Sequence, residues 1–553
     1  MNASCYKIVF SQRLGTLVAV GEHTASAGKA ASGQACRSSS ASHTSPDALA
    51  EGFVGVLRLA FASVALACLS LGSTQAQSAG SGLSPTALPQ GGSINTGSTV
   101  IGVNGAQMVI NQTTDKASIN WQSFNVGTAA SVNITQPSAS SVLLNRVVGN
   151  DSSQILGKLT ANGQLILLNP NGIVFGKDGS VTASTFTAST FGLTDTDFMD
   201  GFYKYKRNGS TAAVVNQGTI ETSAGGFVAL IGATVTNDGT IRAPQGDVIL
   251  AAAENVTLPA GTNNGTVSVR MSKRVRLELD PAAINTAVNN TESGVIVTEG
   301  GQVLLQAAAL STAVASVTHS GSIDTSAPQA GAVTVLAEGG VIKVDGRITA
   351  NSNGSTNGSA NRGGDIIIGR DEETGALAKS TDASGALLST SNGFIETSGE
   401  YLTTTGIQIK AKDWLLDPNN IEINATSAAN TAGNSVVLAS DIVNALSGGA
   451  NVVISTGTAG STNASATSTG SAVGITGTGT QGSGTIAVNT AIAGASNAVI
   501  AGSANSSLTL SAASNITVGA EINTAGDVFL QSSGGMIRNT SAISGRNISI
   551  DNT

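Results

Sequence analysis

One short formula recurs along most of this sequence and constrains its fold more than any other feature. A turn of Asn, Asp or Ser with Gly leads into a short strand containing Ile. A second Gly turn then leads into a strand with alternating Val, Ile or Leu. NQGTIETSAGGFVALIGATV begins at Asn216, and its next version, NDGTIRAPQGDVILAAAENV, begins at Asn237. Related segments begin at Ser293 and Ser320. A period in the low twenties with two or three short strands is typical of a solenoid.

We therefore predict an all-β fold, a right-handed parallel β-helix with an N-terminal cap and small β elements outside the helix. Strand alternation places Ile220, Val228 and Leu230 on one face, which points into a narrow interior. Aromatic residues make up only 3% of the chain, which suits coils stacked about 4.8 Å apart. We expect roughly 20 coils of about 22 residues. An antiparallel sandwich also has short strands and Gly turns, but it does not explain the fixed period.

The N-terminal segment has the features of a cleaved leader. The apolar run Leu59–Leu71 follows Arg58, and its length suits a signal peptide rather than a membrane span. Small residues after the run predict cleavage after Ala76. All three cysteines lie in this leader: Cys5, Cys36 and Cys68. The exported chain would therefore have no disulfide and be held by packing and hydrogen bonds.

The charge of the chain disfavours some partners. The formal net charge of the whole chain is −8. The leader carries a net charge of +2, so the chain after residue 76 carries −10. Nucleic acids and anionic membranes are therefore not expected as main partners.

We divide the chain into a leader at 1–76, a first β-helical domain at 77–320 and further coils at 321–553. The segment 351–364 is rich in Asn, Ser and Gly, which predicts a loop or local insertion. Residues 456–484 are rich in Ser, Thr, Gly and Ala, which predicts disorder or poorly patterned coils. The pattern stops at Thr553 without a visible polar cap, which leaves open whether the sequence is a fragment of a longer protein.

The first residues carry a resemblance to a known targeting segment. Its matching elements are Met1-Asn2, Tyr6–Phe10, Arg13–Gly15, Val18–Val20 and Glu22. In this order they resemble the extended signal-peptide region of large autotransported and two-partner-secreted proteins.

Residues 88–193 carry a second, denser resemblance. The most specific marks are Asn145-Arg146-Val147, the stretch Gly157–Leu168, and Asn169-Pro170-Asn171-Gly172-Ile173. This order is similar to that in secretion domains of the filamentous-haemagglutinin type, and a looser resemblance extends to about residue 320. Some members carry a second motif, Asn-Pro-Asn-Leu, which this sequence lacks. That places it nearer the branch of adhesins without the motif.

The resemblance implies a route of export. A signal peptide would direct the chain through the Sec system. The secretion domain would bind the periplasmic repeat domains of a dedicated outer-membrane barrel transporter, and the chain would fold outside, secreted or on the cell surface. The candidate recognition residues are Asn145, Arg146, Asn169, Pro170, Asn171 and Gly172. The last four also have the composition of a tight turn, in which Pro fixes φ and Asn-Gly supplies left-handed positions. Both interpretations of the turn remain open at this stage.

We find no residue pattern that predicts catalysis, a metal site or a cofactor. His319 is the only histidine after the leader, and we expect it to be an ordinary coil residue. A site of the His/Cys metal type or a Ser-His-Asp arrangement is therefore not expected. Paired carboxylates are the remaining route, as in β-helical polysaccharide-degrading enzymes. Asp365 and the run Asp371–Glu373 are candidates, which we interpret as a solvated loop.

Four further segments have predicted places in the fold. Tyr203–Arg207 alternates aromatic and basic residues, which predicts a contact patch or a loop outside the coils. Lys273–Pro281 resembles a strand of a hairpin outside the helix. Trp414 and Leu415 are expected in the core, and Asp417–Asn420 is expected to form a turn.

These observations favour an adhesin of the haemagglutinin type. A long rod can carry many weak contacts to a host-cell or matrix receptor or a glycan, and such contacts add by multivalency. The first alternative is the stalk of a contact-dependent growth-inhibition toxin. The second is a polysaccharide-degrading β-helix, but we expect no enzyme.

Overall fold

The computed structural model describes residues 6–11, 16–21, 82–258, 270–271, 286–308, 315–356, 359–372, 375–426, 435–456 and 484–552. Residues 1–80 and 81–553 form two separate compact units. In the first unit, β1 (Tyr6–Ser11) and β2 (Thr16–Gly21) pair as an antiparallel hairpin. Ala76 and Lys273–Pro281 lie outside the described residues.

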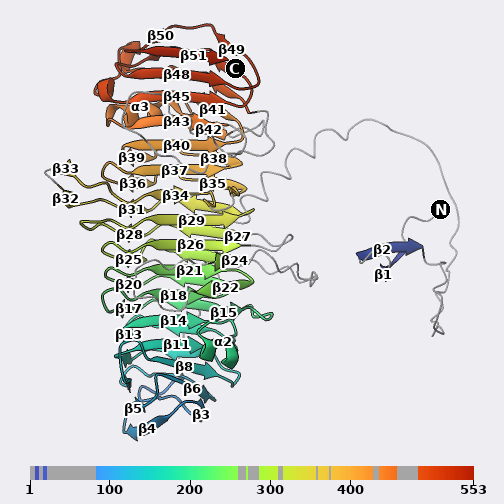
Figure 1. Cartoon of the computed structure of the whole chain (residues 1–553), viewed down its shortest axis with the longest axis vertical. Coiled ribbons are helices and arrows are strands. Elements are labelled where there is room, and N and C mark those ends of the chain that lie inside the picture. Colours follow the sequence, from blue (N-terminus) through green and yellow to red (C-terminus); the bar gives the residue numbers. More distant parts are fainter. Residues whose placement is uncertain are drawn as a thin grey trace. The chain divides into compact units, whose positions relative to one another are not determined.

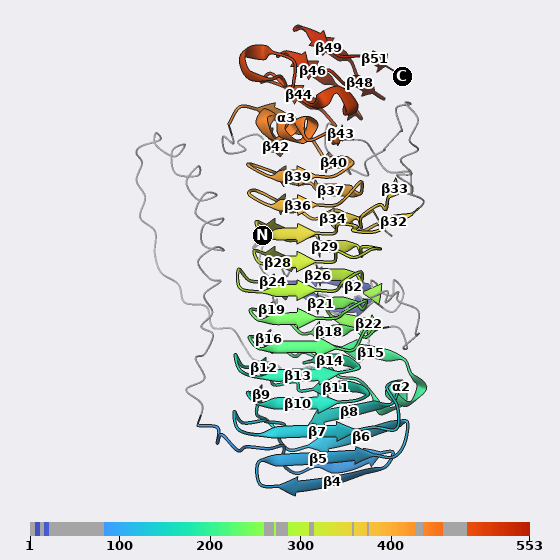
Figure 2. The same ribbon diagram turned by 90° about the vertical axis from the view of Figure 1, so that its left-hand side faces the viewer.

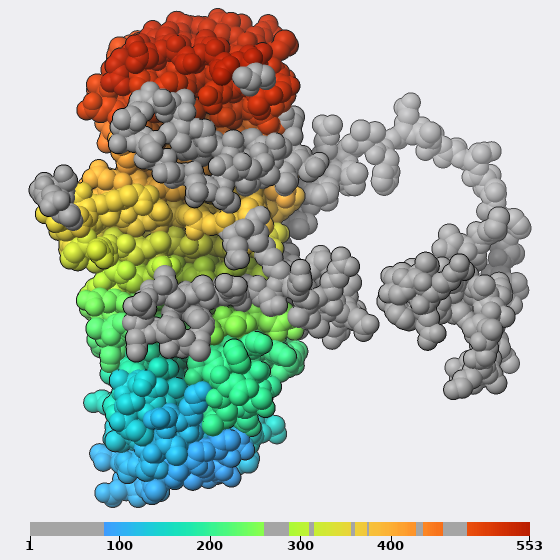
Figure 3. Space-filling model, in the orientation of Figure 1, coloured from blue at the N-terminus to red at the C-terminus, as the bar shows by residue number. Residues whose placement is uncertain are grey.

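The second unit is a parallel β-helix, as the repeat predicts. Three long sheets run along the stack of coils, and each coil contributes strands to them in turn (Figures 1 and 2). In the space-filling view, successive segments of the chain lie in successive bands (Figure 3). Among the described residues, no helix is both long and apolar enough to span a bilayer.

Sheet 1 has 16 strands: β3 (Ser93–Thr96), β6 (Lys116–Trp121), β8 (Val142–Val147), β11 (Gln164–Leu168), β14 (Thr185–Ser189), β18 (Val228–Ile231), β21 (Val248–Ala252), β26 (Val303–Ala308), β29 (Val333–Glu338), β34 (Ile366–Ile368), β37 (Phe394–Gly399), β40 (Asp413–Pro418), β43 (Asn451–Ser455), β45 (Ser507–Ala512), β48 (Asp527–Ser532) and β51 (Ile548–Asn552). Sheet 2 has 12 strands: β4 (Thr99–Asn104), β5 (Gln107–Gln112), β7 (Ser131–Thr135), β10 (Lys158–Ala161), β13 (Ser180–Ala183), β17 (Thr219–Thr222), β20 (Thr240–Arg242), β25 (Val295–Val297), β28 (Ser322–Asp324), β31 (Arg347–Thr349), β36 (Leu387–Ser389) and β39 (Gln408–Lys410). Sheet 3 has 14 strands: β9 (Ser153–Ile155), β12 (Ile173–Phe175), β16 (Ala213–Asn216), β19 (Thr234–Asn237), β24 (Thr286–Asn290), β27 (Ala315–His319), β30 (Val341–Val344), β35 (Ser380–Asp382), β38 (Tyr401–Thr403), β42 (Ser435–Leu438), β41 (Ile421–Asn424), β44 (Ile486–Val488), β46 (Ile516–Val518) and β49 (Ile537–Asn539). The predicted domain boundary at residue 320 falls between β27 and β28, inside this stack.

The register of the coils explains the interior. In sheet 1, Leu165 pairs with Phe186, and Val228 pairs with Val248, so that each residue lies beside its counterpart in the next coil. Because like positions stack, one continuous apolar cluster fills the interior, and it contains Ile220, Val228 and Leu230 as predicted. Each such side chain contributes about 1.5–3 kcal/mol through burial.

The expected number of coils is wrong. Among the described residues, sheet 1 holds 16 strands, fewer than the roughly 20 coils expected, and insertions that lengthen the step from one coil to the next explain the difference. Phe186 pairs with Val228 because residues 190–212, which we call the outer segment, lie outside the coil and lengthen this step along the chain. Val248 pairs with Val303, which is a longer step still; its described residues include Asn255–Leu258 and Arg270–Met271, which pair with each other outside the three long sheets.

Antiparallel strands close the N-terminal end, as the predicted cap requires. β3 pairs with β6, and β4 pairs with β5, both antiparallel, before the parallel coils begin. A closing hairpin of this kind covers the interior that the next coil would otherwise bury.

Small elements outside the coils include helix α2 (Asp195–Asp200) and an antiparallel sheet of β15 (Tyr203–Lys206), β22 (Asn255–Leu258) and β23 (Arg270–Met271). A second apolar cluster lies between these elements and the outer face of sheet 1, with Leu144, Phe198 and Tyr205 as members. The prediction of a loop for Tyr203–Arg207 is therefore wrong: Tyr203 and Tyr205 point into this cluster, and the alternation makes the segment a strand.

Further small elements interrupt the coils among the described residues. Residues 351–364 contain the hairpin β32 (Ser355–Thr356) and β33 (Ser359–Ala360), in agreement with a local insertion. The remaining elements are α3 (Ala439–Ser447), η1 (Ala495–Asn497), η2 (Ser503–Asn505) and the parallel pair β47 (Ile522–Asn523) and β50 (Ile543–Ser544). Of the low-complexity segment 456–484, residues 457–483 lie outside the described residues.

The segment around Trp414 is partly as predicted. Trp414 and Leu415 are both buried, and Trp414 Nε1 donates to Thr397 Oγ1 at 3.1 Å. The predicted turn at Asp417–Asn420 is wrong in its first half. Asp417 and Pro418 continue β40 because they pair with the end of β37, and the bend begins only at Asn419.

Buried amides connect successive coils in sheet 3. Asn216 Nδ2 donates to Asn237 Oδ1 at 2.8 Å, and Asn237 Nδ2 donates to Asn290 Oδ1 at 2.7 Å. Asn290 Nδ2 lies 3.1 Å from His319 Nδ1, and His319 Nε2 lies 3.1 Å from the Arg347 carbonyl oxygen. We call these four stacked side chains the amide ladder. These side chains stand at the turn position of the recurring formula. The Asn at this position therefore forms hydrogen bonds to the next coil as well as within its own turn.

Candidate functional site

The turn Asn169–Gly172 follows β11 and is fastened to the coil before it. Asn169 is buried, and its Nδ2 donates to the Asp151 carbonyl and to Ser153 Oγ, both at 2.9 Å. Its Oδ1 accepts from the Asn171 backbone N–H at 2.9 Å. Asn171 Nδ2 reaches the Gly149 carbonyl at 2.8 Å. These bonds fix the turn without any partner molecule.

The left-handed geometry of this turn is confined to one residue. Gly172 has φ 114°, whereas Asn171 has no positive φ, so the expectation of two left-handed positions is wrong for Asn171. The Gly172 N–H donates to the Asn169 carbonyl at 3.1 Å and closes the turn. Pro170 and Asn171 are exposed, whereas Asn169 and Gly172 are buried. Only the two middle residues are therefore available to another molecule.

The predicted pair Asn145 and Arg146 points to opposite faces of β8. Asn145 is fully buried, and its Oδ1 accepts from Trp121 Nε1 at 3.0 Å. It satisfies the indole inside the coil, so the folded domain does not present it to a partner.

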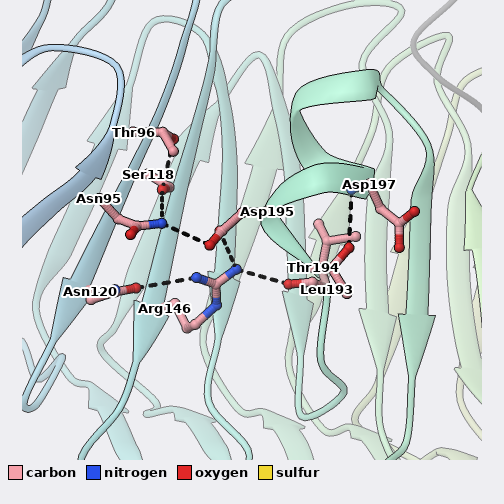
Figure 4. A network of polar contacts seen from close by, with 9 residues as sticks. All are labelled: Asn95, Thr96, Ser118, Asn120, Arg146, Leu193, Thr194, Asp195 and Asp197. Carbon is pink, nitrogen blue, oxygen red and sulfur yellow. Dashed lines mark hydrogen bonds and ion pairs between the residues drawn. The ribbon is translucent and has the colours of Figure 1, made fainter.

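Arg146 faces outward and connects three segments (Figure 4). Its Nη2 donates to the Leu193 carbonyl and to Asp195 Oδ1, both at 2.8 Å, and its Nη1 donates to Asn120 Oδ1 at 3.3 Å. Asn95 Nδ2, from the cap strand β3, donates to Asp195 Oδ2 at 2.9 Å. Arg146 therefore fastens the start of α2 to the coils and, through Asp195, to the cap.

The electrostatics of this network favour the ion pair. Partial burial raises the pKa of Asp195, but the hydrogen bonds from Arg146 and Asn95 outweigh it and leave that pKa below its usual value. At the other end of α2, Lys116 Nζ donates to the carbonyls of Phe198 at 3.2 Å and Met199 at 2.7 Å. A cation at a helix C-terminus interacts favourably with the free carbonyls.

Sequence reasoning missed Asp195, Asn95 and Lys116. Asp195 lies far along the chain from both Arg146 and Asn95, which its side chain contacts. No local pattern connects residues so far apart. The one available signal was Thr194, which precedes α2 and caps it by accepting from the Asp197 N–H at 3.0 Å.

The structure brings two of the predicted residues into one pocket. A cavity of about 380 Å³ opens between the outer segment and the coils, and Arg146 and Pro170 line it together with Phe191, Arg207 and Ser210. Ser210 Oγ donates to the Pro170 carbonyl at 3.0 Å, which connects the outer segment to the turn. Asn145 and Asn169 are not part of its wall.

The other candidates from the sequence lie elsewhere. His319 is a buried coil residue at the end of the amide ladder, as expected. Arg362 pairs with Asp365, and Glu373 lies outside the described residues. Arg370 binds the fully buried Glu396 with two of its nitrogens.

Glu372 is close enough to this pair to be affected by it. Burial raises its pKa, the Glu396 charge raises it further, and Arg370 opposes the rise. In the part of the chain that the structure describes, no group of three or more His, Cys, Asp or Glu side chains could hold a metal ion.

Comparison with known families finds two matches. The model of the TPS secretion domain matches residues 86–324, and that of the extended signal peptide of type V secretion systems matches residues 1–50. The first range contains the turn Asn169–Gly172, Arg146 and the pocket. The second contains the hairpin of β1 and β2.

Two curated relatives are both described as heme/hemopexin-binding proteins of Haemophilus influenzae. One is 35% identical over 190 residues, which are 33% of this chain and 21% of the relative. The other is 37% identical over 112 residues, which are 20% of this chain and 12% of the relative. The chain thus spans about a fifth or less of the length of these relatives.

Two solved structures are similar at lower identity. The HMW1 secretion domain from Haemophilus influenzae is 20% identical, with a TM-score of 0.48, and covers 84% of this chain and 100% of its own. A filamentous hemagglutinin secretion domain is 15% identical, with a TM-score of 0.32, and covers 64% of this chain and 98% of its own. Because the two family models match in this order along the sequence, the chain carries an extended signal peptide of type V secretion systems followed by a TPS secretion domain, a pair that implies export by an outer-membrane transporter.

Proposed function

We propose that the exposed middle of the turn, Pro170 and Asn171, forms part of the surface that the transporter recognises. The observation that carries this proposal is the difference in burial between the ends and the middle of the four-residue turn. Asn169 and Gly172 already fix the turn from inside, yet Pro170 and Asn171 remain exposed on it. A preformed, rigid turn loses little conformational entropy when it binds, which favours recognition.

Secretion of a variant at Asn171 tests this proposal if it is compared with a matched control. Asn171→Ala removes a side chain that donates to Gly149 in the preceding coil. Asn162→Ala removes an equally exposed clamp, since Asn162 donates to the Gln136 carbonyl at 2.9 Å and accepts from its N–H at 2.7 Å. Both variants should lower the free energy of unfolding by similar amounts, about 1–2 kcal/mol each.

We expect secretion into the medium to fall for Asn171→Ala and to persist for Asn162→Ala. Equal loss of secretion in both variants would mean that folding outside the cell, not recognition, limits export. The parallel coils make such a folding-driven step reasonable, because each coil contacts mainly its neighbours and folding can propagate from the first coil to emerge.

We further propose that the coils after the secretion domain act as an adhesin. The β-helix continues past residue 324, with sheet 2 running to β39, sheet 3 to β49 and sheet 1 to β51, so a long surface of parallel coils follows the part that export requires. Repeated weak contacts along such a surface would add by multivalency, with a host-cell or matrix receptor or a glycan as the partner. A chain ended after β28 should still be secreted but no longer retain cells on a coated plate. Equal adhesion by the shortened chain would contradict the proposal.

A second candidate follows from the curated relatives, which are described as heme/hemopexin-binding proteins. His319 is the only histidine after residue 43, and it is buried, so a heme iron would need another axial ligand such as Tyr or Met. We therefore favour adhesion. Titration of the secreted chain with hemin, followed by its absorption spectrum, and a pull-down with hemopexin would distinguish the two functions.

We infer that the chain is not an enzyme. Glu396 and Glu372 lie near Arg370, which forms an ion pair with Glu396. Reducing-sugar release from a panel of polysaccharides should stay at the level of buffer, and activity that disappears in Glu396→Gln would refute this. The alternative of a toxin stalk predicts that cells expressing the protein inhibit the growth of neighbouring cells. Unchanged growth of the neighbouring cells in co-culture would contradict this alternative.

A further inference from the structure

The pocket beside the turn contains an arginine whose bonds are incomplete. Arg207 follows β15, and only 4% of it is exposed. Its Nε donates to the Ser210 carbonyl at 2.8 Å, and its backbone N–H donates to the Glu254 carbonyl at 2.9 Å. Its Nη2 is buried, and no described residue accepts a hydrogen bond from it. A buried guanidinium with an unused donor is costly, so such groups mark places where a ligand or ion is bound.

The charged groups around the pocket leave Arg207 as the less neutralised of two cations. Arg146 lines the same cavity, but its Nη2 is already bonded to Asp195 and to the Leu193 carbonyl. Glu254 is the nearest anionic influence on Arg207, and no hydrogen bond between the two side chains is formed. Burial lowers the pKa of Arg207, and the Glu254 charge opposes that effect. Because an arginine stays protonated in proteins, the charge persists.

The remaining walls suit a small molecule. Phe191, Leu168 and Val147 are apolar, and Thr190, Asn208 and Ser210 supply polar groups at the wall. A volume of about 380 Å³ lies within the range of roughly 300–1,000 Å³ that ligand sites occupy. An apolar wall with a few polar groups and an arginine that is not fully neutralised suits an organic anion.

We propose that this pocket binds a small organic anion whose carboxylate or phosphate group accepts hydrogen bonds from Arg207. The oxyanion completes the donor set of Arg207, and the rest of the ligand, about the size of one sugar ring, lies against Phe191. The site is part of the secretion domain, and the proposal does not depend on adhesion or on recognition of the turn by the transporter.

The test uses the full secreted chain and ligand-observed NMR with three probes. Glucuronate carries a carboxylate on a sugar ring, inorganic phosphate carries the alternative oxyanion, and glucose is the neutral analogue. Ionic strength is held constant with sodium chloride. We expect saturable binding of glucuronate, phosphate or both, and none of glucose. The probe that binds identifies which oxyanion the pocket prefers.

Two variants and a matched control connect this binding to Arg207. Arg207→Met removes the cation and keeps an unbranched apolar stem, and we expect affinity to fall about tenfold or more. Arg207→Lys retains the positive charge but lacks the planar guanidinium, so its affinity for the anion should lie between those of the wild type and Arg207→Met. The control is Arg242→Met, because Arg242 forms an exposed pair with Glu299 on a coil outside the pocket. We expect affinity to change less than about twofold in the control.

Several outcomes would overturn the proposal. Absence of saturable binding by both anions is one, and equal binding of glucose is another. If Arg242→Met weakens binding as much as Arg207→Met, the interaction reflects overall charge rather than a site. If Arg207→Met does not fold, Arg207→Lys takes its place in the test. The assignment is then refuted if Arg207→Lys binds the anion as tightly as the wild type while the control Arg242→Met binds it more weakly.

Discussion

Protonation of His319 should loosen the middle of the β-helix below neutral pH. The side chain is fully buried in the amide ladder, where its Nδ1 accepts from Asn290 Nδ2 and its Nε2–H donates to the Arg347 carbonyl. A second proton on Nδ1 would set two N–H donors against each other. Burial accordingly lowers the pKa of His319 from 6.5 to about 4, while the Arg347 hydrogen bond and the Asp345 charge oppose this.

The direction of the pH effect follows from linkage. The unfolded chain takes up the proton near pH 6.5, whereas the folded chain resists it until about pH 4. The stabilising contribution is therefore complete above pH 6.5 and is lost as the pH falls from 6.5 toward 4. With these values the loss is about 2 kcal/mol at pH 5 and about 3 kcal/mol at pH 4. Burial raises the pKa of Asp345, but the hydrogen bonds from Lys343 and Ser320 outweigh it and leave the pKa below its usual value, so Asp345 stays charged in this window.

Hydrogen exchange measured by mass spectrometry can detect this change locally. Global melting is less suitable because a stack of coils opens in parts. After correction for intrinsic exchange rates, the opening free energy of β24, β27 and β30 should fall by about 2 kcal/mol between pH 7.5 and 5. His319→Asn extends the ladder with a side chain that does not titrate, and it should abolish this fall.

The variant has its own cost and its own control. Asn is smaller than His, so His319→Asn should lose about 1 kcal/mol at pH 7.5. His319→Ala leaves the Asn290 donor unpaired. Its opening free energy in these strands should be lower than that of the wild type at pH 7.5 and should not change between pH 7.5 and 5. If the opening free energy of β24 and β30 falls between pH 7.5 and 5 as much in His319→Asn as in the wild type, the titrating group is not His319 and the reasoning is refuted.

Three further outcomes follow from the same geometry. Asn237→Leu leaves both neighbouring ladder amides with an unpaired buried group, so hydrogen exchange in β16 and β24 should speed up by the equivalent of about 3 kcal/mol, and unchanged exchange would contradict the ladder's role. Gly172→Ala should lower stability by about 1–2 kcal/mol in thermal melts because φ is 114°, not because of a clash, since the nearest atom to an added Cβ is 3.5 Å away. Arg146→Met should raise the pKa of Asp195, measured by carboxyl NMR, and make α2 easier to cleave by protease, whereas the loss of stability should stay below about 1 kcal/mol because Asp195 is 42% exposed.

The recurring formula was sufficient to predict the coils because its information is local. Gly and Asn at corners and alternating Val, Ile and Leu in strands need only their sequence neighbours, and stacking then repeats one solution. The number of coils was overestimated because insertions such as the outer segment have no fixed period. Tyr203–Arg207 was assigned to a loop because the cluster that buries Tyr205 consists of residues from distant coils.

The order of residues along the chain is enough to specify the β-helix, the extended signal peptide and the secretion domain, since each is a local or periodic pattern. What the marked residues do depends instead on the folded molecule. Folding turns Asn145 inward to Trp121, joins Arg146 to Asp195, and places Arg207 in a pocket with Pro170. The physical reason is that coil stacking and the outer segment bring together side chains far apart in the chain, and burial and charge act across space rather than along the sequence.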